Sequence, residues 1–100
     1  MNLQDALDQI GQLSDDDVIF ARKPWTPESE AAIGVFDAVF RVPSEIAERG
    51  LEYFLEASVA NEALNDFTFR DRKPTPNEQR ALLIYYAEND AYPEWAYSDR

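Results

Sequence analysis

The chain has 100 residues, 45% of them hydrophobic and 13% aromatic, and its 20 acidic and 9 basic residues give a net charge of −11. The mean hydropathy is −0.50 and the isoelectric point is near 4.2. This apolar content is too high for a disordered acidic chain, and the length is typical of one domain. We therefore expect residues 1–100 to form a single acidic domain.

The net negative charge limits the classes of molecule that the protein is expected to bind. Such a field repels nucleic acids and anionic lipids, because binding to either needs clustered Lys and Arg side chains. The same field attracts basic protein surfaces and speeds encounter with them. The one basic cluster, Arg70, Arg72 and Lys73, lacks the interleaved aromatic residues of a nucleic-acid site. We expect a protein partner with a basic surface, no nucleic acid and no membrane.

The residue types argue against catalysis. The chain has no His and no Cys, which removes the commonest general base, the commonest zinc ligands and the thiolate nucleophile. Its three glycines are too scattered for a phosphate-binding loop. We predict no catalytic residue, no metal site and no cofactor, and hence no enzyme. A small hydrolase built on a carboxylate pair, either Glu28 with Glu30 or Glu88 with Asp90, is a minor alternative.

Three consecutive aspartates, Asp15, Asp16 and Asp17, invite a calcium interpretation. The EF-hand loop, however, alternates its acidic ligands and needs a central glycine and a distal glutamate. Consecutive acids also point in different directions on a regular backbone. We interpret these residues as a solvated turn after a helix.

The sequence favours a cytoplasmic location. Residues 1–13 lack the basic region that opens a signal peptide. No apolar run approaches the roughly 18 residues of a membrane span. The lack of cysteine fits a reducing compartment. We expect a cytoplasmic monomer or weak homodimer.

Elements of the first half follow from apolar spacing and turn residues. Helical spacing predicts a helix over 3–13 with Asn2 as its N-cap. Residues 17–22 are β-branched and aromatic and are predicted to form a strand. Two prolines make 23–27 a loop, and 31–36 is predicted to be a second strand.

Residues 38–42 either extend the second strand or pair with it. A short helical turn follows and ends at Gly50, because glycine suits the position after a helix. We expect a strand over 51–57 and then a helix over 58–66 that Ser58 caps.

The clearest local signal is the capping box of Thr75 and Glu78, with proline at the first helical position. It predicts a helix that runs to about Glu88 and buries Leu82 and Leu83. The order of elements predicts an α+β fold. We expect a small, mostly antiparallel sheet of three to four strands, with helices packed on one face.

Aromatic and acidic residues alternate towards the C-terminus. Tyr and Trp are favoured binding anchors, since they bury large areas at little cost in side-chain entropy. An alternative is that the aromatic residues of this tail fold back onto a small core. The residues predicted to bind the partner are Trp25, Glu88, Asp90, Tyr92, Glu94, Trp95, Tyr97 and Asp99.

Trp25 lies between Pro24 and Pro27, so a rigid loop presents its indole. The sequence leaves two placements open. The ring is either an exposed anchor for a partner or a lid that covers the sheet.

Three segments carry a resemblance: 23–27 (KPWTP), 47–55 (AERGLEYFL) and 82–92 (LLIYYAENDAY). They are similar to segments of a small, uncharacterised bacterial protein family. In being small, acidic and α+β, the chain also resembles the immunity proteins of bacterial polymorphic toxin systems.

The resemblance implies a cytoplasmic, non-catalytic protein that binds and inhibits a cognate toxin. The toxin is expected to be a nucleic-acid-acting enzyme with a basic active-site groove. The alternative is a regulatory or adaptor module that binds proteins and has no toxin partner. A neighbouring toxin gene distinguishes the two.

Overall fold

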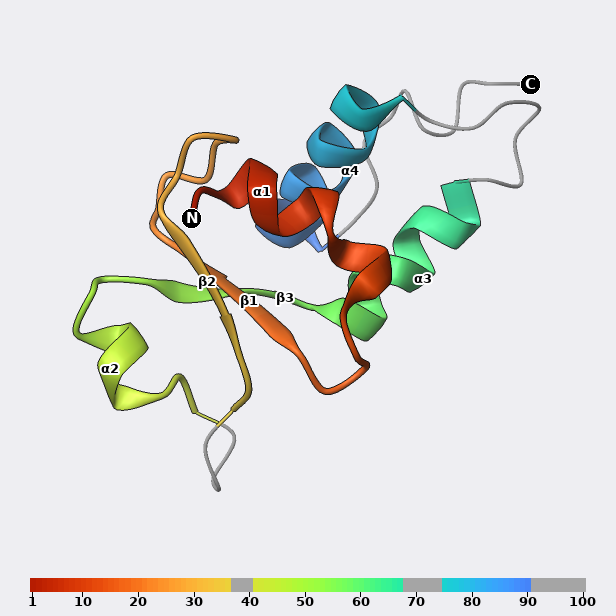
Figure 1. The fold of residues 1–100 in the computed structure, drawn as a ribbon. Helices are drawn as coiled ribbons and strands as arrows, with labels where there is room; N and C mark the ends of the chain where they lie inside the picture. The colour runs from red at the N-terminus through yellow and green to blue at the C-terminus, as the bar shows by residue number, and fades with distance from the viewer. Residues whose placement is uncertain (37–40, 68–74, 91–100) are drawn as a thin grey trace.

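The structure of the chain is a computed structural model. It describes residues 1–36, 41–67 and 75–90. Among these residues, three antiparallel strands form a sheet in the order β2-β1-β3 (Figure 1). The strands are β1 (Val18–Ala21), β2 (Ala31–Gly34) and β3 (Glu52–Glu56). The predicted α+β class and antiparallel sheet are confirmed.

The helices lie on both faces of the sheet. Those of the described chain are α1 (Leu3–Asp8), the 3-10 helix η1 (Ile10–Gln12), α2 (Ser44–Ala47), α3 (Ala57–Phe67) and α4 (Pro76–Asn89). Helices α1, α3 and α4 pack on one face with η1, as predicted, whereas the short α2 covers the other (Figure 1). The sheet is therefore the middle layer of the domain.

Strand β1 is buried on both of its faces. Ile19 and Ala21 point into the core beneath α1, α3 and α4, which we call the main core. Val18 and Phe20 point the other way, into a smaller second core. Because β1 is central, all four of its residues are buried, and the strand is apolar without alternation.

A β-bulge in the pairing of β1 with β3 decides which aromatic side chains reach the main core. Ile19 pairs with Leu55 and Phe20 pairs with Tyr53, so Phe54 is an extra residue on its strand. As a result, the consecutive residues Phe54 and Leu55 both enter the main core. Tyr53 is left on the other face.

The N-terminal segment differs from its prediction. Asn2 caps α1, since its Oδ1 accepts a hydrogen bond from the amide of Asp5 at 2.9 Å. The α-helix ends at Asp8, however, and continues only as η1. The predicted single helix over 3–13 is therefore wrong. The 3-10 turn still buries Ile10, so the apolar spacing holds across the break.

The strands are shorter than predicted, and residues 41 and 42 form no strand. Residues 37–40 lie outside the described part of the chain. The prediction that Ser58 caps a helix is also wrong, because α3 begins at Ala57, directly after β3. Alanines at 57, 60 and 63 form the buried side of α3, and their small size lets the helix lie close to its neighbours.

The turn after α2 confirms the role predicted for Gly50. Its φ is 76°, a left-handed conformation that glycine adopts without strain. Its amide donates to the carbonyl of Ala47 at 2.9 Å, and the amide of Leu51 donates to that of Ile46 at 3.4 Å. This pair of bonds is a Schellman motif, and the Leu51 and Ile46 side chains meet in the second core.

Helix α4 begins as predicted. The hydroxyl of Thr75 accepts from the Glu78 amide at 3.2 Å, and the Glu78 carboxylate accepts from the Thr75 amide at 2.9 Å. Leu82 and Leu83 are both buried, and Leu83 belongs to the main core. The opposite side of α4 stays at the surface and forms part of the site described next.

Candidate functional site: a groove beside Trp25 and the acidic end of α4

The loop after β1 is held rigidly by its own hydrogen bonds. The Ser29 hydroxyl donates to the carbonyl of Pro24 at 2.9 Å and accepts from the Thr26 amide at 2.8 Å. The first amides of α1 donate to this loop, from Leu3 to Ser29 at 2.7 Å and from Gln4 to Pro27 at 2.9 Å. The Lys23–Pro24 peptide bond of this loop is cis. The hydrogen bonds hold the loop as a wall against α1.

Trp25 is a lid on the sheet, the second of the two placements left open by the sequence. Its side chain is only 8% exposed. The indole Nε1 donates to the carbonyl of Ala21 at 3.1 Å, so its polar group is satisfied while it is buried. The ammonium of Lys23 lies 4.9 Å from the centroid of the ring. Trp25 therefore presents only an edge to the surface.

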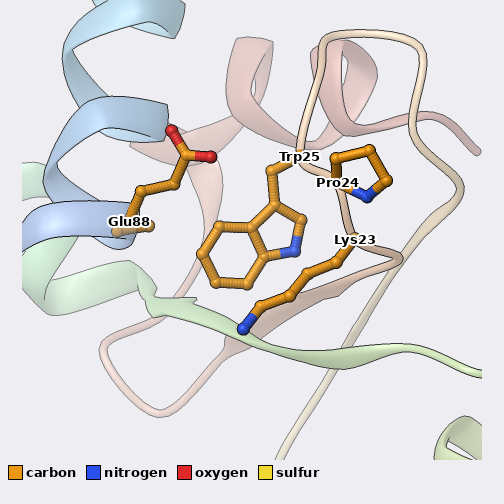
Figure 2. Close-up of a pocket in the computed structure, with 5 residues that line it drawn as sticks. Lys23, Pro24, Trp25 and Glu88 are labelled. Atoms are coloured by element: carbon orange, nitrogen blue, oxygen red, sulfur yellow. The ribbon is translucent and has the colours of Figure 1, made fainter.

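A groove separates this loop from α4. It consists of two hollows of about 520 and 490 Å³, which share Trp25 and Glu88 as lining residues. Figure 2 shows the Glu88 carboxylate and the Lys23 side chain on either side of the indole. Other described residues that line the groove are Pro24, Thr26, Pro27, Asn77, Arg80, Ala81, Ile84, Tyr85 and Ala87. We call this feature the Trp25 groove.

The charges of the Trp25 groove are nearly balanced. The guanidinium of Arg80 binds both carboxylate oxygens of Asp8 on α1, with N–O distances of 3.0 and 2.8 Å. This hydrogen-bonded pairing raises the pKa of Arg80. Among the described residues, Glu88 is the one carboxylate that lines the groove.

The end of α4 is different, because negative charge accumulates there. Glu88 and Asp90 are both exposed, and the last turn contains no basic residue. The carbonyl end of a helix is itself negative, so these acids add to its field. Tyr85, one turn before, is 41% exposed. We call Tyr85, Glu88 and Asp90 the acidic end of α4.

Asp90 adopts an unusual backbone conformation at this end. Its φ of 53° and ψ of 36° are left-handed, and its amide donates to the carbonyl of Tyr86 at 2.8 Å. Glycine and asparagine are the residues that favour such a helix end. An aspartate in this position lowers stability in two ways: its backbone is strained in the left-handed conformation, and its charge is repelled by the negative end of the helix dipole.

Of the predicted site residues that the structure describes, Trp25 and Glu88 are brought together, and Asp90 caps the C-terminus of α4 two residues after Glu88. Trp25 and Glu88 line the same groove. The other predicted binding residues lie outside the described part of the chain: Tyr92, Glu94, Trp95, Tyr97 and Asp99. The basic cluster at 70–73 lies outside it as well.

The aspartate run forms a turn, as interpreted from the sequence. The Ser14 amide donates to Asp17 Oδ2 at 2.9 Å, and the Asp17 amide donates to the Ser14 carbonyl at 3.1 Å. Asp15 and Asp16 are exposed. In the described ranges, no three residues of the metal-binding types gather into a potential ion site.

Sequence reasoning missed one aromatic surface. Tyr53 is 38% exposed and stacks on Phe36, with 5.7 Å between ring centroids and 24° between their planes. The signal was present in the chain, because adjacent residues of a strand normally face opposite sides. Of the neighbours Tyr53 and Phe54, one was therefore bound to leave the main core.

Fold and surface together define a small acidic α+β domain with a groove and an aromatic face. The chain belongs to the family described as "Domain of unknown function (DUF7716)", whose model matches residues 1–95. No curated protein and no solved structure matched the chain. Within the described residues, no helix has the length and apolar character needed to cross a membrane. Membership of this family agrees with the resemblance to a family without an assigned function, and it provides no link to immunity proteins.

Proposed function

We propose that the protein is a non-catalytic inhibitor that binds a basic protein partner, in the manner of a bacterial immunity protein. The partner would be a toxin that acts on nucleic acid, and the complex would form in the cytoplasm. The acidic end of α4 supports this proposal most directly. It combines an exposed tyrosine with two exposed carboxylates at the negative end of a helix.

Asp90 favours a role in binding over one in folding. A left-handed aspartate at a helix C-terminus lowers stability twice, through its backbone and through the helix dipole. Residues that cost stability tend to occur where function needs them. A carboxylate fixed at this point would attract a cationic side chain of a partner.

The neighbouring groove supplies the apolar part of such a surface. Ile84 and Tyr85 of α4 face Pro27 across it, and the edge of Trp25 forms its floor. Protein interfaces combine an apolar centre with a charged rim. The acids around it would steer a basic partner into place and speed association.

The mechanism we propose is occlusion. Toxins that cleave or modify nucleic acid need a positive groove for the phosphate backbone. A surface with carboxylates and aromatic rings can pair with the same cationic side chains and keep the substrate out. Inhibition of this kind is stoichiometric and needs no reaction by the inhibitor.

Co-expression tests the proposal. The reading frame immediately upstream is expressed in bacterial cells, alone and together with this protein. We expect toxicity alone, rescue by the wild type, and loss of rescue with a Glu88→Lys/Asp90→Lys variant. A Glu28→Lys/Glu62→Lys variant is the matched control, because it changes the net charge equally at exposed positions elsewhere.

Two outcomes would contradict the proposal. If the neighbouring product is harmless and yet binds the protein, an adaptor role replaces inhibition. If both double variants rescue growth as well as the wild type, the acidic end of α4 is not the binding surface.

A further inference from the structure

The hollow of about 490 Å³ in the Trp25 groove, which we call the smaller hollow, combines apolar groups, an aromatic ring and a carboxylate. Its α4 wall consists of residues spaced by three and four positions, which share one face of the helix: Ala81, Ile84, Tyr85 and Glu88. Trp25 and Pro27 line it from the loop. A side chain that enters the smaller hollow therefore contacts all three kinds of group along one helix face.

The positive charge on the lining of the smaller hollow is already neutralised. Arg80 is the one basic residue among the described residues that line it. Its guanidinium binds both carboxylate oxygens of Asp8 and donates to Asn77 Oδ1 at 2.8 Å. Arg80 and Glu88 are two turns apart on α4, about 12 Å along the axis, which exceeds the roughly 8 Å screening length at physiological ionic strength. Arg80 therefore does not compensate the charge of Glu88.

Lys23 does not neutralise Glu88 either. It lines the other hollow, and its ammonium lies 4.9 Å from the centroid of the Trp25 ring. Figure 2 shows Lys23 and Glu88 on either side of that ring. Across residues 1–36, 41–67 and 75–90, no ion pair joins Glu88 to a basic side chain. The carboxylate of Glu88 is thus the charged group of the groove that is left for a ligand.

The chemistry of this helix face matches an arginine side chain. A guanidinium can stack on an aromatic ring while its edge donates two hydrogen bonds to a carboxylate. The ring and the carboxylate must then be neighbours, and residues three apart on a helix have Cβ atoms about 5 to 6 Å apart. Tyr85, which is 41% exposed, and exposed Glu88 have this spacing. The apolar stem of an arginine suits contact with Ile84 and Pro27.

We infer that the smaller hollow binds an arginine side chain of the protein partner, with its guanidinium between the ring of Tyr85 and the carboxylate of Glu88. This inference rests on the proposed function and names the side chain that the surface selects. Arginine is a preferred residue for phosphate recognition. An arginine of the partner that is held in the smaller hollow is no longer available to a nucleic acid.

A titration with blocked amino acids tests the inference. The full chain, labelled with ¹⁵N, is titrated with N-acetyl-arginine amide, with its lysine counterpart, and with its citrulline counterpart, which has the shape of arginine without the charge. We expect arginine to shift the amide signals of Tyr85 and Glu88 and the indole signal of Trp25. Lysine should shift them several-fold less, and citrulline should leave them in place. Equal shifts with arginine and either counterpart, or arginine shifts confined to other signals, would overturn the inference.

Ring variants test the stacking contact. Tyr85→Ala should weaken binding of N-acetyl-arginine amide about two- to fivefold, the usual effect of losing an exposed cation–π contact. Tyr85→Phe restores the ring and should recover most of that loss. If Tyr85→Ala binds the arginine probe as tightly as the wild type does, the guanidinium does not stack on Tyr85 and the inference fails.

Charge variants separate a site from general attraction. Glu88→Gln should weaken binding of the arginine probe about fivefold or more, because the paired carboxylate is lost. Glu62→Gln removes the same charge from an exposed position on α3 and should change binding less than twofold, about what screening allows. Equal losses in both variants would show attraction without a site. If the toxin is neutralised equally well by the wild type and Tyr85→Ala, this inference fails while the proposed function stands.

Discussion

The indole of Trp25 packs edge-on against the ring of Phe54, with 5.0 Å between ring centroids and an angle of 80° between their planes. The contact depends on the β-bulge, which turns Phe54 into the main core beside Leu55. It fastens the loop after β1 to β3, the strand that pairs with β1. One wall of the Trp25 groove is therefore part of the folded core.

Replacement of Trp25 should reveal this structural role. Trp25→Ala is expected to lower the free energy of unfolding by about 3 to 5 kcal/mol, the usual cost of removing a buried Trp. Trp25→Phe should lower the free energy of unfolding by less, because it keeps an aromatic ring against Phe54. It still loses the hydrogen bond to the Ala21 carbonyl, so some cost remains. Urea denaturation measures both. Wild-type stability in Trp25→Ala would contradict the buried placement.

The capping box of α4 should contribute measurably to stability. Thr75→Ala removes the hydroxyl that accepts from Glu78 and should cost about 1 kcal/mol. Thr75→Ser retains the hydroxyl and is expected to cost far less. Thermal or urea unfolding compares the two, and an equal loss in both variants would exclude the cap as the cause.

Glu30 should make stability depend on pH in the acid range. The guanidinium of Arg49 donates to Glu30 Oε2 with N–O distances of 2.7 and 3.1 Å, which holds the pKa of this carboxyl below its usual range, and the charge of Arg22 adds to the effect. Because the pKa of Glu30 is lower in the folded state than in the unfolded state, ionised Glu30 stabilises the fold fully at pH values above its unfolded-state pKa. This stabilisation is lost as the pH falls through the folded-state pKa of Glu30.

Unfolding of the wild type and Glu30→Gln as a function of pH tests this. The advantage of the wild type should be present at neutral pH and disappear in the acid range. Glu28→Gln removes an exposed carboxylate two residues away and should leave the wild-type profile in place. A constant difference between Glu30→Gln and the wild type at all pH values would contradict the assignment.

Asp90 should show a trade-off between stability and binding. Asp90→Gly relieves the left-handed backbone and removes a charge from the negative helix end, so it should stabilise the fold by about 1 kcal/mol. Asp90→Asn keeps a residue that tolerates this conformation and tests the charge alone. Both variants should bind a basic partner more weakly. A variant that gains stability and keeps full affinity would remove the functional argument for Asp90.

Local signals in the sequence predicted much of the fold. The Asn2 cap, the left-handed Gly50 and the capping box of Thr75 and Glu78 each satisfy backbone groups within a few residues. Such features depend on nearby chemistry alone, and the structure confirms all three. The boundary between α1 and η1 and the direct passage from β3 to α3 are set by packing between distant segments, and they were predicted wrongly.

The candidate site was predictable only in part. Glu88 and Asp90 follow from the position of acids at a helix end, which the sequence shows. The outward position of Tyr53 follows from strand alternation, but the entry of both Phe54 and Leu55 into the main core depends on the β-bulge, and no pairing register can be read from one strand alone. The burial of Trp25 likewise depends on Phe54, which lies far along the chain.

The most direct test of the account is calorimetric titration of the wild type and the Glu88→Lys/Asp90→Lys variant with the protein encoded immediately upstream. We predict a one-to-one complex with the wild type, weaker at about 300 mM than at about 50 mM salt because the attraction between exposed charges is screened. The double variant should lose most of that affinity. Salt-independent binding, or equal affinity of both proteins, would contradict the claim that the acidic end of α4 binds a basic partner.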